Sequence, residues 1–582
     1  MTKINIKKVF ASVALVGMLG FAGLLNMFGV AQAVAGDNVV LQWNKNFGGS
    51  SAENFESIIL TSDGGYIAAG SSYSTDGDLT GLNKGSNDAI IVKYNPAGAT
   101  EWNKNFGGSG DDRFYSIAQT PDGGYIVAGC SNSTNDDLTG LNKGSYDAII
   151  VKYDSNGEIE WNKNFGGSSW DQFQSVAITS DGGYIATGFS RSTNGDLTGL
   201  NKGDYDATIV KYDPSGVIEW NKNFGGSRVE YFYSIAQVSD GGYIATGFSN
   251  STNGDLIGLN KGDYDATIVK YDPSGVIEWN KNFGGSDSDG FNSIAPTPDG
   301  GYIAVGNSES TNSDLTGLNK GGYDAIIAKY SSTGTLEWNK NFGGNYNDNF
   351  NSIAPTPDGG YIVAGRSYST DGDLTGLNKG DRDAIIAKYS STGTLEWNKN
   401  FGGSDSDEFF SIAPTPDGGY VAVGYSRSTD GDLIGLNKGS TDFIIVKYLD
   451  TSEPVIVVPP LIEPDTPNGS AGATGCDPVK VTLKTNVPIV IPNGWTKADG
   501  LTYTKTYTRN TTEIVPMVGL NGVVGENVEI VIDTITCRPT NPITPPNTGL
   551  SVVQIGGLLV AGLATIAVAV ILARRLSGMI VK

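Results

Sequence analysis

One string of seven residues, Trp-Asn-Lys-Asn-Phe-Gly-Gly, occurs seven times in this chain at a constant spacing of 59 residues. No insertion or deletion interrupts the register, so every copy occupies the same place in the same structural unit. The copies begin at Trp43, Trp102, Trp161, Trp220, Trp279, Trp338 and Trp397. Repeats of this length form supersecondary units whose apolar faces are buried by their neighbours. Residues 39–448 are therefore expected to form a row or a ring of like units.

Each unit reads as four short β-strands. In the second unit these are the runs Phe114 to Thr120, Tyr125 to Gly129, Ala148 to Tyr153 and Glu160 to Phe165, which are rich in β-branched and aromatic residues. An Asp-Gly-Gly turn between the first two runs is a hairpin signal. The fourth run alternates with a period of two, which places its aromatic residues on one face. Four strands in a unit of this length predict a propeller blade, with the repeated Trp packed between blades.

The two ends of the array distinguish a ring from a row. Six complete units run from Phe55 to Phe401, and the seventh supplies only three strands, between Phe409 and Tyr448. The segment from Val40 to Gly49 carries Trp and Phe in the places of the missing strand. An open row would leave two unpaired edges that promote aggregation. We therefore predict an all-β fold in which a seven-bladed β-propeller, residues 39–448, is closed by its N-terminal strand.

The repeated motifs also resemble a known group of proteins. Gly-Gly-Ser and Asp-Gly-Gly-Tyr-Ile strings recur along the whole array, as at Gly48 to Ser50 and Asp63 to Ile67. They are similar to the repeats of large secreted bacterial proteins. The resemblance implies a propeller and a role at the cell surface, and it supplies no catalytic residues.

Composition excludes several classes of function. The chain has no His, which rules out a Ser/His/Asp triad, a Cys/His pair and a His-ligated zinc site. The formal net charge is −23, from 62 acidic and 39 basic residues, and this argues against a nucleic-acid partner. Gly accounts for 81 of the 582 residues, in keeping with many tight turns.

The N-terminal segment has the three parts of a secretory signal. Lys3, Lys7 and Lys8 precede an uncharged, mostly apolar run from Val9 to Val30, and small residues follow in the A-x-A order around Ala33. We predict that residues 1–35 are a signal peptide and that the protein is exported. An uncleaved membrane anchor is the alternative, because the apolar run is long.

The C-terminal segment predicts attachment to the membrane or the cell wall. Residues 550–573 carry no charge and are long enough to cross a bilayer as a helix, and residues 574–582 form a basic tail expected in the cytoplasm. The preceding pentapeptide, Pro545-Pro546-Asn547-Thr548-Gly549, with this span and tail, resembles the sortase signal of Gram-positive surface proteins. The resemblance implies cleavage between Thr548 and Gly549 by a sortase and joining to the envelope. Pro545 stands where the family has Leu, and a plain transmembrane anchor is the alternative.

A second small domain is predicted between the propeller and this anchor. Residues 449–472 are a Pro-rich linker, residues 473–538 read as four or five short strands, and residues 539–549 are a spacer containing the sorting motif. The Thr- and Tyr-rich run Thr502 to Thr508 resembles the immunoglobulin-like modules of bacterial surface proteins, which implies a small β-sandwich serving as a stalk. Cys476 and Cys537 bracket this segment, and a disulfide between them would contribute about 4 kcal/mol. Two reduced thiols are the alternative.

The long loop of each repeat carries recurring aspartates. Calcium needs six to eight oxygen ligands in a flexible loop, and a D-x-D pair with a third Asp nearby would supply the carboxylates. The candidate ligands are Asp76, Asp78, Asp88, Asp137, Asp147, Asp196, Asp206, Asp255, Asp265, Asp314, Asp324, Asp373, Asp383, Asp432 and Asp442. The alternative is a set of Asx-turns, in which these side chains bond to the loop backbone.

The loops that pass from one blade to the next are the most varied part of the repeat. In a propeller they share one face with the long loops, so binding specificity is expected on that face. The candidate binding residues are Glu53, Asp112, Trp170, Glu230, Tyr231, Asp289, Asp348 and Glu408. Unconstrained drift of these loops is the competing interpretation.

These features favour a non-catalytic protein of the cell surface. We expect the anchored propeller to act in adhesion or in binding an extracellular glycan or protein. Two alternatives are a glycosidase-like propeller, which would need one asymmetric carboxyl pair, and a purely structural envelope protein. No pair of acidic residues is singled out by the sequence.

Overall fold

The computed structural model describes residues 39–450 and, beyond them, five short strands. The described part of the chain after Asp450 consists of β29 (Val479–Lys484), β30 (Thr496–Asp499), β31 (Thr502–Tyr507), β32 (Thr511–Val515) and β33 (Val528–Ile532). The chain divides into two compact units: residues 39–450, apart from one short turn, lie in the first, and the five strands lie in the second. Each unit is described by itself.

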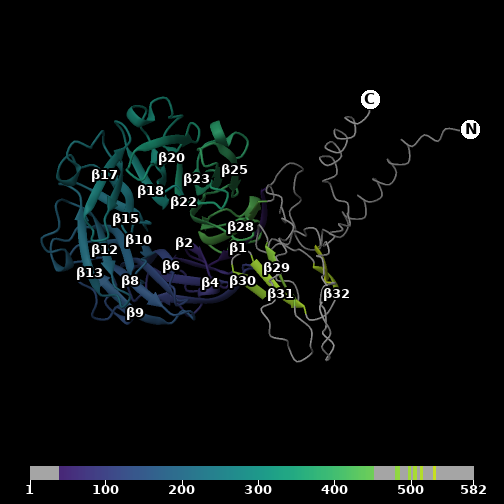
Figure 1. Cartoon of the computed structure of the whole chain (residues 1–582). Helices are drawn as coiled ribbons and strands as arrows, with labels where there is room; N and C mark the ends of the chain where they lie inside the picture. Colours follow the sequence, from purple (N-terminus) through teal and green to yellow (C-terminus); the bar gives the residue numbers. More distant parts are fainter. Residues whose placement is uncertain are drawn as a thin grey trace, which may run out of the picture. The chain divides into compact units, whose positions relative to one another are not determined.

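Residues 39–450 form seven antiparallel sheets of four strands, which confirms the predicted seven-bladed propeller. Figure 1 shows the sheets arranged in a ring, with the first strand of each blade near the centre and the fourth at the rim. The innermost strands are β2 (Glu53–Leu60), β6 (Asp112–Gln119), β10 (Asp171–Ile178), β14 (Glu230–Gln237), β18 (Asp289–Pro296), β22 (Asp348–Pro355) and β26 (Asp407–Pro414). The outermost strands are β5 (Thr100–Phe106), β9 (Ile159–Phe165), β13 (Ile218–Phe224), β17 (Ile277–Phe283), β21 (Leu336–Phe342), β25 (Leu395–Phe401) and β1 (Val39–Phe47).

The two middle strands of each blade are almost wholly buried, because they lie between sheets on both faces. The second strands are β3 (Tyr66–Ser72), β7 (Tyr125–Ser131), β11 (Tyr184–Ser190), β15 (Tyr243–Ser249), β19 (Tyr302–Ser308), β23 (Tyr361–Ser367) and β27 (Tyr420–Ser426). The third strands are β4 (Asp88–Tyr94), β8 (Asp147–Tyr153), β12 (Asp206–Tyr212), β16 (Asp265–Tyr271), β20 (Asp324–Tyr330), β24 (Asp383–Tyr389) and β28 (Asp442–Asp450).

A single 3-10 turn lies in each long loop between the second and third strands. These turns are η3 (Gly77–Leu79), η4 (Asp136–Leu138), η5 (Gly195–Leu197), η6 (Gly254–Leu256), η7 (Ser313–Leu315), η8 (Gly372–Leu374) and η9 (Gly431–Leu433). Each ends with a buried Leu that fixes the loop against the blade.

The N-terminal strand closes the ring, as predicted. β1 pairs antiparallel with β28, from Val39 opposite Asp450 to Phe47 opposite Phe443. Across the closing junction Phe55 of β2 stacks on Phe443 with ring centroids 3.8 Å apart. The first and seventh blades therefore share one core, and the ring has no open edge.

The repeated Trp packs between blades, which confirms the prediction for this residue. Trp279 of β17 contacts Tyr302 of the next blade with ring centroids 5.9 Å apart. A Cβ on Gly334, in the same blade as Tyr302, would come within 2.9 Å of the Trp279 ring, so Gly is required there. The other Trp–Tyr contacts are Trp43–Tyr66, Trp102–Tyr125, Trp161–Tyr184, Trp220–Tyr243, Trp338–Tyr361 and Trp397–Tyr420.

Each innermost strand contains a β-bulge that the sequence pattern did not reveal. In β18 the pairing with β19 shifts between Phe291 and Ser293, so Asn292 is the extra residue. The Asn292 side chain donates to the carbonyl oxygen of Phe350 in the next innermost strand, at 2.9 Å. A bulge re-aims one side chain per strand. In this ring it turns one residue of each blade toward its neighbour near the centre.

The second unit contains five described strands. β29, β31 and β30 form a three-stranded antiparallel sheet, and β32 pairs with β33. The immunoglobulin-like sandwich stays a prediction. No helix among the described residues is long and apolar enough to cross a bilayer. Residues 1–35, Cys476, Cys537, the PPNTG motif and residues 550–582 lie outside the described part of the chain.

Candidate binding face

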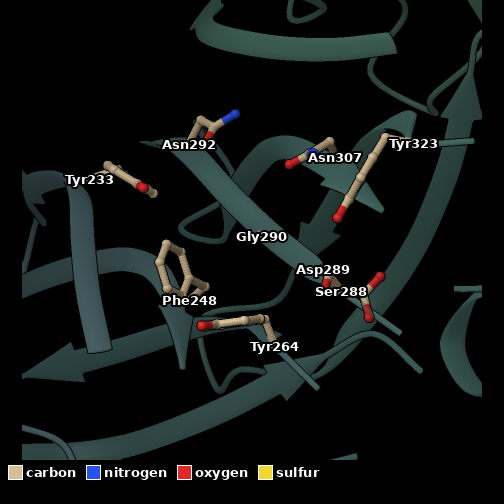
Figure 2. Close-up of a pocket in the computed structure, with 9 residues that line it drawn as sticks. All are labelled: Tyr233, Phe248, Tyr264, Ser288, Asp289, Gly290, Asn292, Asn307 and Tyr323. Carbon is tan, nitrogen blue, oxygen red and sulfur yellow. The ribbon is translucent and has the colours of Figure 1, made fainter. Parts of the chain in front are cut away.

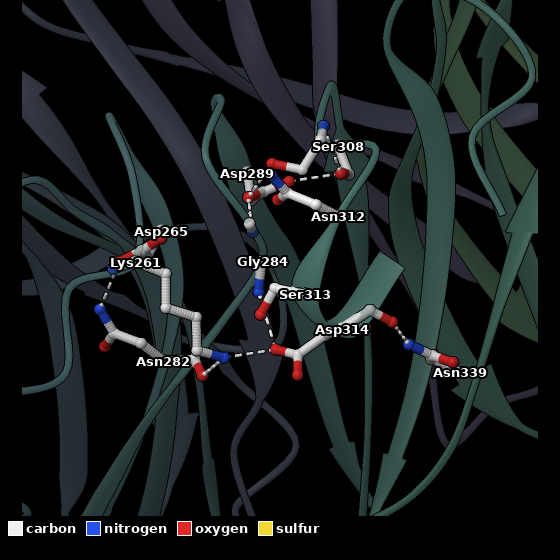
Figure 3. Close-up of polar contacts among 12 residues, drawn as sticks. Lys261, Asp265, Asn282, Gly284, Asp289, Ser308, Asn312, Ser313, Asp314 and Asn339 are labelled. Carbon is white, nitrogen blue, oxygen red and sulfur yellow. Dashed lines mark hydrogen bonds and ion pairs between the residues drawn. The ribbon is translucent and has the colours of Figure 1, made fainter. Parts of the chain in front are cut away.

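The loop aspartates form a polar framework at every junction between blades. Figure 3 shows the junction of the fourth and fifth blades, where the N–H of Lys261 donates to Asp265 Oδ2 at 2.6 Å. The Lys261 ammonium forms an ion pair with Asp314 of the next blade and donates to the carbonyl oxygen of Asn282 at 2.8 Å. The N–H of Gly284 donates to Asp314 Oδ2 at 3.1 Å. The Asp314 carboxylate thus joins the long loop of the fifth blade to the fourth blade.

The same ion pair recurs at all seven junctions, including the one that closes the ring. The pairs are Lys84–Asp137, Lys143–Asp196, Lys202–Asp255, Lys261–Asp314, Lys320–Asp373, Lys379–Asp432 and Lys438–Asp78. Asp76, at the start of the D-x-D pair, accepts the N–H of Ser50 at 2.7 Å. The candidate calcium ligands therefore make loop contacts of the kind that the alternative interpretation expects.

Within the described residues, no group of three acidic or Cys side chains is placed to hold a metal ion. One carboxylate oxygen per blade is nevertheless buried without a hydrogen-bond partner among those residues: Oδ1 of Asp88, Asp147, Asp206, Asp265, Asp324, Asp383 and Asp442. Calcium binding stays a prediction, and titration calorimetry with calcium would test it.

A second buried acid lies at the entry of each innermost strand. Asp289 accepts hydrogen bonds from the hydroxyl groups of Ser308 and Ser310 and from the N–H of Gly285. Burial raises the pKa of Asp289, and the charge of Asp265 in the previous blade raises it further. Burial also raises the pKa of Asp265. The two carboxyl groups at this junction therefore hold protons more tightly than exposed ones do.

Five of the eight candidate binding residues belong to this buried set. Glu53, Asp112, Glu230, Asp289 and Asp348 are at most 3 % exposed, and Glu408, a sixth candidate outside this set, is 1 % exposed. The carboxylates of the set position the loops from beneath and are not presented to solvent. The expectation that these acids form the outer surface of the face is therefore corrected, because desolvated and fully bonded carboxylates serve as loop anchors here.

Four positions per blade that differ between repeats, together with the residue directly before each innermost strand, are called the variable face. The residue before the innermost strand is Ala52, Asp111, Trp170, Val229, Ser288, Asn347 or Ser406. The second residue of the innermost strand is Asn54, Arg113, Gln172, Tyr231, Gly290, Asn349 or Glu408. The bulge residue is Glu56, Tyr115, Gln174, Tyr233, Asn292, Asn351 or Phe410. Opposite the first set, near the end of the second strand, lie Ser71, Cys130, Phe189, Phe248, Asn307, Arg366 and Tyr425. The residue before the third strand is Asn87, Tyr146, Tyr205, Tyr264, Tyr323, Arg382 or Thr441.

Backbone contacts bring these positions together from neighbouring blades. The N–H of Asp289 donates to the carbonyl oxygen of Tyr264 in the previous blade at 2.8 Å, and equivalent bonds join Asp348 to Tyr323 and Asp407 to Arg382. The start of each innermost strand is thus held beside the start of the preceding blade's third strand. The variable positions of adjacent blades therefore lie next to one another around the ring.

Aromatic rings dominate the variable face on the third and fourth blades. Trp170, which is 41 % exposed, lies 6.1 Å from Phe189 between ring centroids. Phe189 contacts Tyr231 at 4.2 Å, Tyr231 contacts Phe248 at 5.0 Å, and Phe248 contacts Tyr264 at 5.2 Å. Packing against one another fixes these rings in position. Trp170 is exposed, Tyr231, Phe248 and Tyr264 are half-buried, and Phe189 is buried beneath them.

Ionic groups dominate the opposite side of the variable face. The Glu408 carboxylate accepts Arg366 Nη1 at 2.6 Å and lies 3.3 Å from Arg382 Nη1. Arg382 also stacks over the ring of Tyr425, with 5.3 Å between the guanidinium carbon and the ring centroid. Burial raises the pKa of the Glu56 carboxyl to about 8, and the charge of Glu408 adds to this rise. The two sides of the face therefore suit different chemical groups.

A pocket of about 290 Å³ opens on the variable face between the fourth and fifth blades. Figure 2 shows Gly290 in the middle of the view, with Tyr233 and Phe248 on one side and Asn307 and Tyr323 on the other. Tyr264, Ser288, Asp289 and Asn292 complete the lining. The pocket lies next to the aromatic rings described above.

Sequence reasoning found Trp170, Tyr231 and Glu408 but missed most of the variable face. Tyr264, Asn307 and Arg382 lie in the second and third strands or beside them, where no loop signal marks them. Aligning the repeats column by column would have found them, since these columns vary while their neighbours are constant. The bulge that places Glu56 and Asn292 near the centre has no such signal.

Comparison with known proteins adds little about function. No protein-family model matches the chain. The chain is 24% identical over 425 residues to the regulatory protein FlaEY of Caulobacter vibrioides, a match covering 65% of this chain and 42% of that protein. This chain therefore spans less than half the length of that relative.

Two solved structures are among those that are similar to this chain. Sqt1 from Chaetomium thermophilum is 12% identical, with a TM-score of 0.36, over 66% of this chain and 83% of that chain. The Pan2 WD40 domain of Neurospora crassa is 9% identical, with a TM-score of 0.30, over 57% of this chain and 88% of that chain. Similarities this low carry no information about ligand or activity.

Proposed function

We propose that this protein is a non-catalytic binding protein displayed on the cell surface, whose propeller contacts an extracellular glycan or protein through the variable face. One observation carries the proposal. The side chains that differ between repeats gather on one face and divide into an aromatic and an ionic side, above a framework that is repeated seven times. A uniform structural ring would need no such difference between blades.

The third and fourth repeats provide the sharpest argument against unconstrained drift. Residues 189–227 and 248–286 differ only at Arg191/Asn250 and Thr198/Ile257. In the segments that follow directly, Tyr231 corresponds to Gly290 and Tyr233 to Asn292. Five of the eight differences between residues 228–239 and 287–298 lie at the start of the innermost strand, at the variable face, and the other three lie at its end, beside the following turn. Selection for a ligand accounts for this pattern.

Display outside the cell is supported by the sequence at both ends of the chain. A signal peptide at residues 1–35 would export the protein, and the PPNTG motif with residues 550–573 would hold it at the envelope. Mass spectrometry of protein released from intact cells tests this part. A chain ending at Thr548 with an envelope fragment supports sortase anchoring, and a chain ending at Lys582 supports a membrane anchor.

The binding function is tested with glycan arrays and immobilised extracellular matrix proteins. The full chain is compared with the double variant Trp170→Ala, Tyr231→Ala, which removes two rings from the aromatic side. The matched control is Val217→Ala, Val276→Ala, which removes two exposed apolar side chains from turns outside the variable face. We expect specific binding that the first variant loses and the control keeps. Absence of any specific binding would overturn the proposal.

A glycoside hydrolase is the second candidate, and one observation favours it. Glu56 and Glu408 form a carboxyl pair that occurs in no other repeat, and the raised pKa of Glu56 suits a general acid beside a carboxylate. The test is turnover of polysaccharides and aryl glycosides by the full chain, with Glu56→Gln and Glu408→Gln as variants. Turnover that either variant abolishes supports the enzyme, and no turnover by the natural chain removes it.

A further inference from the structure

The backbone at position 290 could accept a residue with a side chain, whereas most glycines of the propeller could not be replaced without strain or a clash. It has no positive φ, and a Cβ built on it would lie 3.7 Å from its nearest neighbour, Asn307 Oδ1. By contrast, a Cβ on Gly306, which pairs with the next residue, Phe291, would lie 1.9 Å from the carbonyl oxygen of Gly290. The other six repeats carry Asn, Arg, Gln, Tyr, Asn and Glu at the position of Gly290. The missing side chain is therefore what opens the pocket.

The walls of this pocket combine aromatic rings with uncharged polar groups. Phe248 contacts Tyr264 with ring centroids 5.2 Å apart and Tyr233 with centroids 5.7 Å apart. The Asn292 amide nitrogen donates to Asn349 Oδ1 and to the carbonyl oxygen of Phe350, which leaves its Oδ1 as an acceptor. Asn307 makes no side-chain hydrogen bond among the described residues.

The charge around the pocket favours a neutral ligand. No Lys or Arg lines it, and the one lining acid, Asp289, is 3 % exposed and already bonded to Ser308, Ser310 and Gly285. A volume of about 290 Å³ lies at the lower end of the range for small-molecule sites, which suits one ring rather than an extended chain. Rings that stack on C–H groups, together with amides that bond to hydroxyl groups, are a combination that recognises sugars.

We propose that the pocket around Gly290 binds one neutral pyranose residue of a glycan, with its ring against the aromatic wall and its hydroxyl groups bonded to Asn292 and Asn307. This inference rests on the proposed binding function and specifies the ligand of one site on the variable face. The neighbouring ring of Tyr231, which is half-buried, extends the same surface toward the rest of the glycan.

The test uses saturation-transfer NMR on the full chain with methyl glycosides of glucose, galactose, mannose, N-acetylglucosamine and N-acetylgalactosamine. Glucuronate and choline serve as charged comparison probes, the latter because aromatic pockets also bind quaternary ammonium groups. Gly290→Asn fills the pocket with a residue that two other repeats carry, and Tyr264→Ala removes one wall. Val276→Ala is the control, because Val276 is an exposed residue of a turn in the same blade as Tyr264 and lies outside the variable face and the pocket.

We expect at least one neutral glycoside to bind, with a loss of about tenfold or more in affinity in Gly290→Asn and Tyr264→Ala and less than about twofold in Val276→Ala. Circular dichroism and thermal unfolding confirm that the variants are folded. If choline or glucuronate binds in place of the neutral sugars, the inference is wrong. If no sugar binds but a matrix protein does, the inference fails while the proposed binding function stands; if nothing binds on any array, both fail.

Discussion

Glu56 shows how one residue changes the chemistry of a repeated scaffold. Its place is that of the bulge residue, which is Tyr, Gln, Tyr, Asn, Asn and Phe in the other six repeats. Burial and, to a smaller extent, the charge of Glu408 raise the pKa of Glu56 to about 8, although the charge of Arg113 opposes the rise. The folded protein therefore holds a proton on Glu56 at a pH where an exposed Glu is ionised.

The raised pKa of Glu56 predicts that the folded protein loses stability as pH rises and that substituting Glu56 removes this loss. Between pH 4.5 and 8 the folded state binds the Glu56 proton more tightly than the unfolded state does, so the free energy of unfolding falls as pH rises. Glu56→Gln keeps the shape and loses the titration. We expect the variant to gain about 1–3 kcal/mol over the natural chain on going from pH 5 to pH 8.5. Urea unfolding of both proteins at the two pH values measures this gain. If the free energy of unfolding changes equally with pH in the variant and in the natural chain, Glu56 is not buried as described.

The closing junction contains one strand residue that departs from the repeat. Phe443 of β28 stands where the other six third strands have Ala, and it is fully buried between Phe47 and Phe55. The seventh blade is the one whose outer strand comes from the other end of the chain. Phe443 thus adds apolar contact between β28 and β1, two paired strands that no loop connects.

Phe443→Ala restores the repeat consensus, yet we expect it to destabilise the propeller. Loss of a buried aromatic side chain leaves a cavity and costs about 3–5 kcal/mol. Denaturant unfolding of the full chain measures the cost, with Phe443→Leu as a control that keeps most of the volume. A Phe443→Ala variant as stable as the natural chain would show that this side chain does not contribute to ring closure.

The elements of the propeller were predictable because their signals are local and repeated seven times. Turn motifs, alternating strands and the three-stranded last unit indicated the blades and the closure by β1. The bulges were not predictable, since a one-residue shift of pairing leaves no mark between Phe291 and Ser293. The pairing of Lys261 with Asp314 was missed for a different reason, because it joins residues of different blades that only the ring brings together.

Across the whole molecule, buried carboxyl groups set the response to pH. Burial raises the pKa of most of the acids at the junctions, and that of Asp324 rises to about 6. In the turns between the first two strands the shift is opposite: hydrogen bonds from Thr297 and Lys329 lower the pKa of Asp299 to about 2. The junction acids, whose pKa values are raised, stabilise the folded state at acidic pH and lose this contribution as pH rises. The turn aspartates, whose pKa values are lowered, stabilise it at higher pH and lose this contribution only at strongly acidic pH.

We therefore expect maximal stability between about pH 4 and 5. Above this range the junction carboxyls lose protons that the fold holds, and below it the turn aspartates gain protons that weaken their bonds to Lys. Thermal unfolding of the full chain from pH 3 to pH 8 measures the profile. A fall in melting temperature of about 5 °C or more between pH 5 and pH 7.5 is expected. A maximum at pH 7 to 8 would contradict the burial of these acids.

The most direct test of the central claim, that the variable face is the binding site, is hydrogen–deuterium exchange of the full chain with and without its strongest binder from the arrays. We predict protection in the segments that begin the innermost strands of the third, fourth and fifth blades, around Trp170, Tyr231 and Gly290. The Asp-Gly-Gly turns, whose sequence is shared by all blades, should exchange unchanged. Protection of those turns, with none on the variable face, would contradict the account.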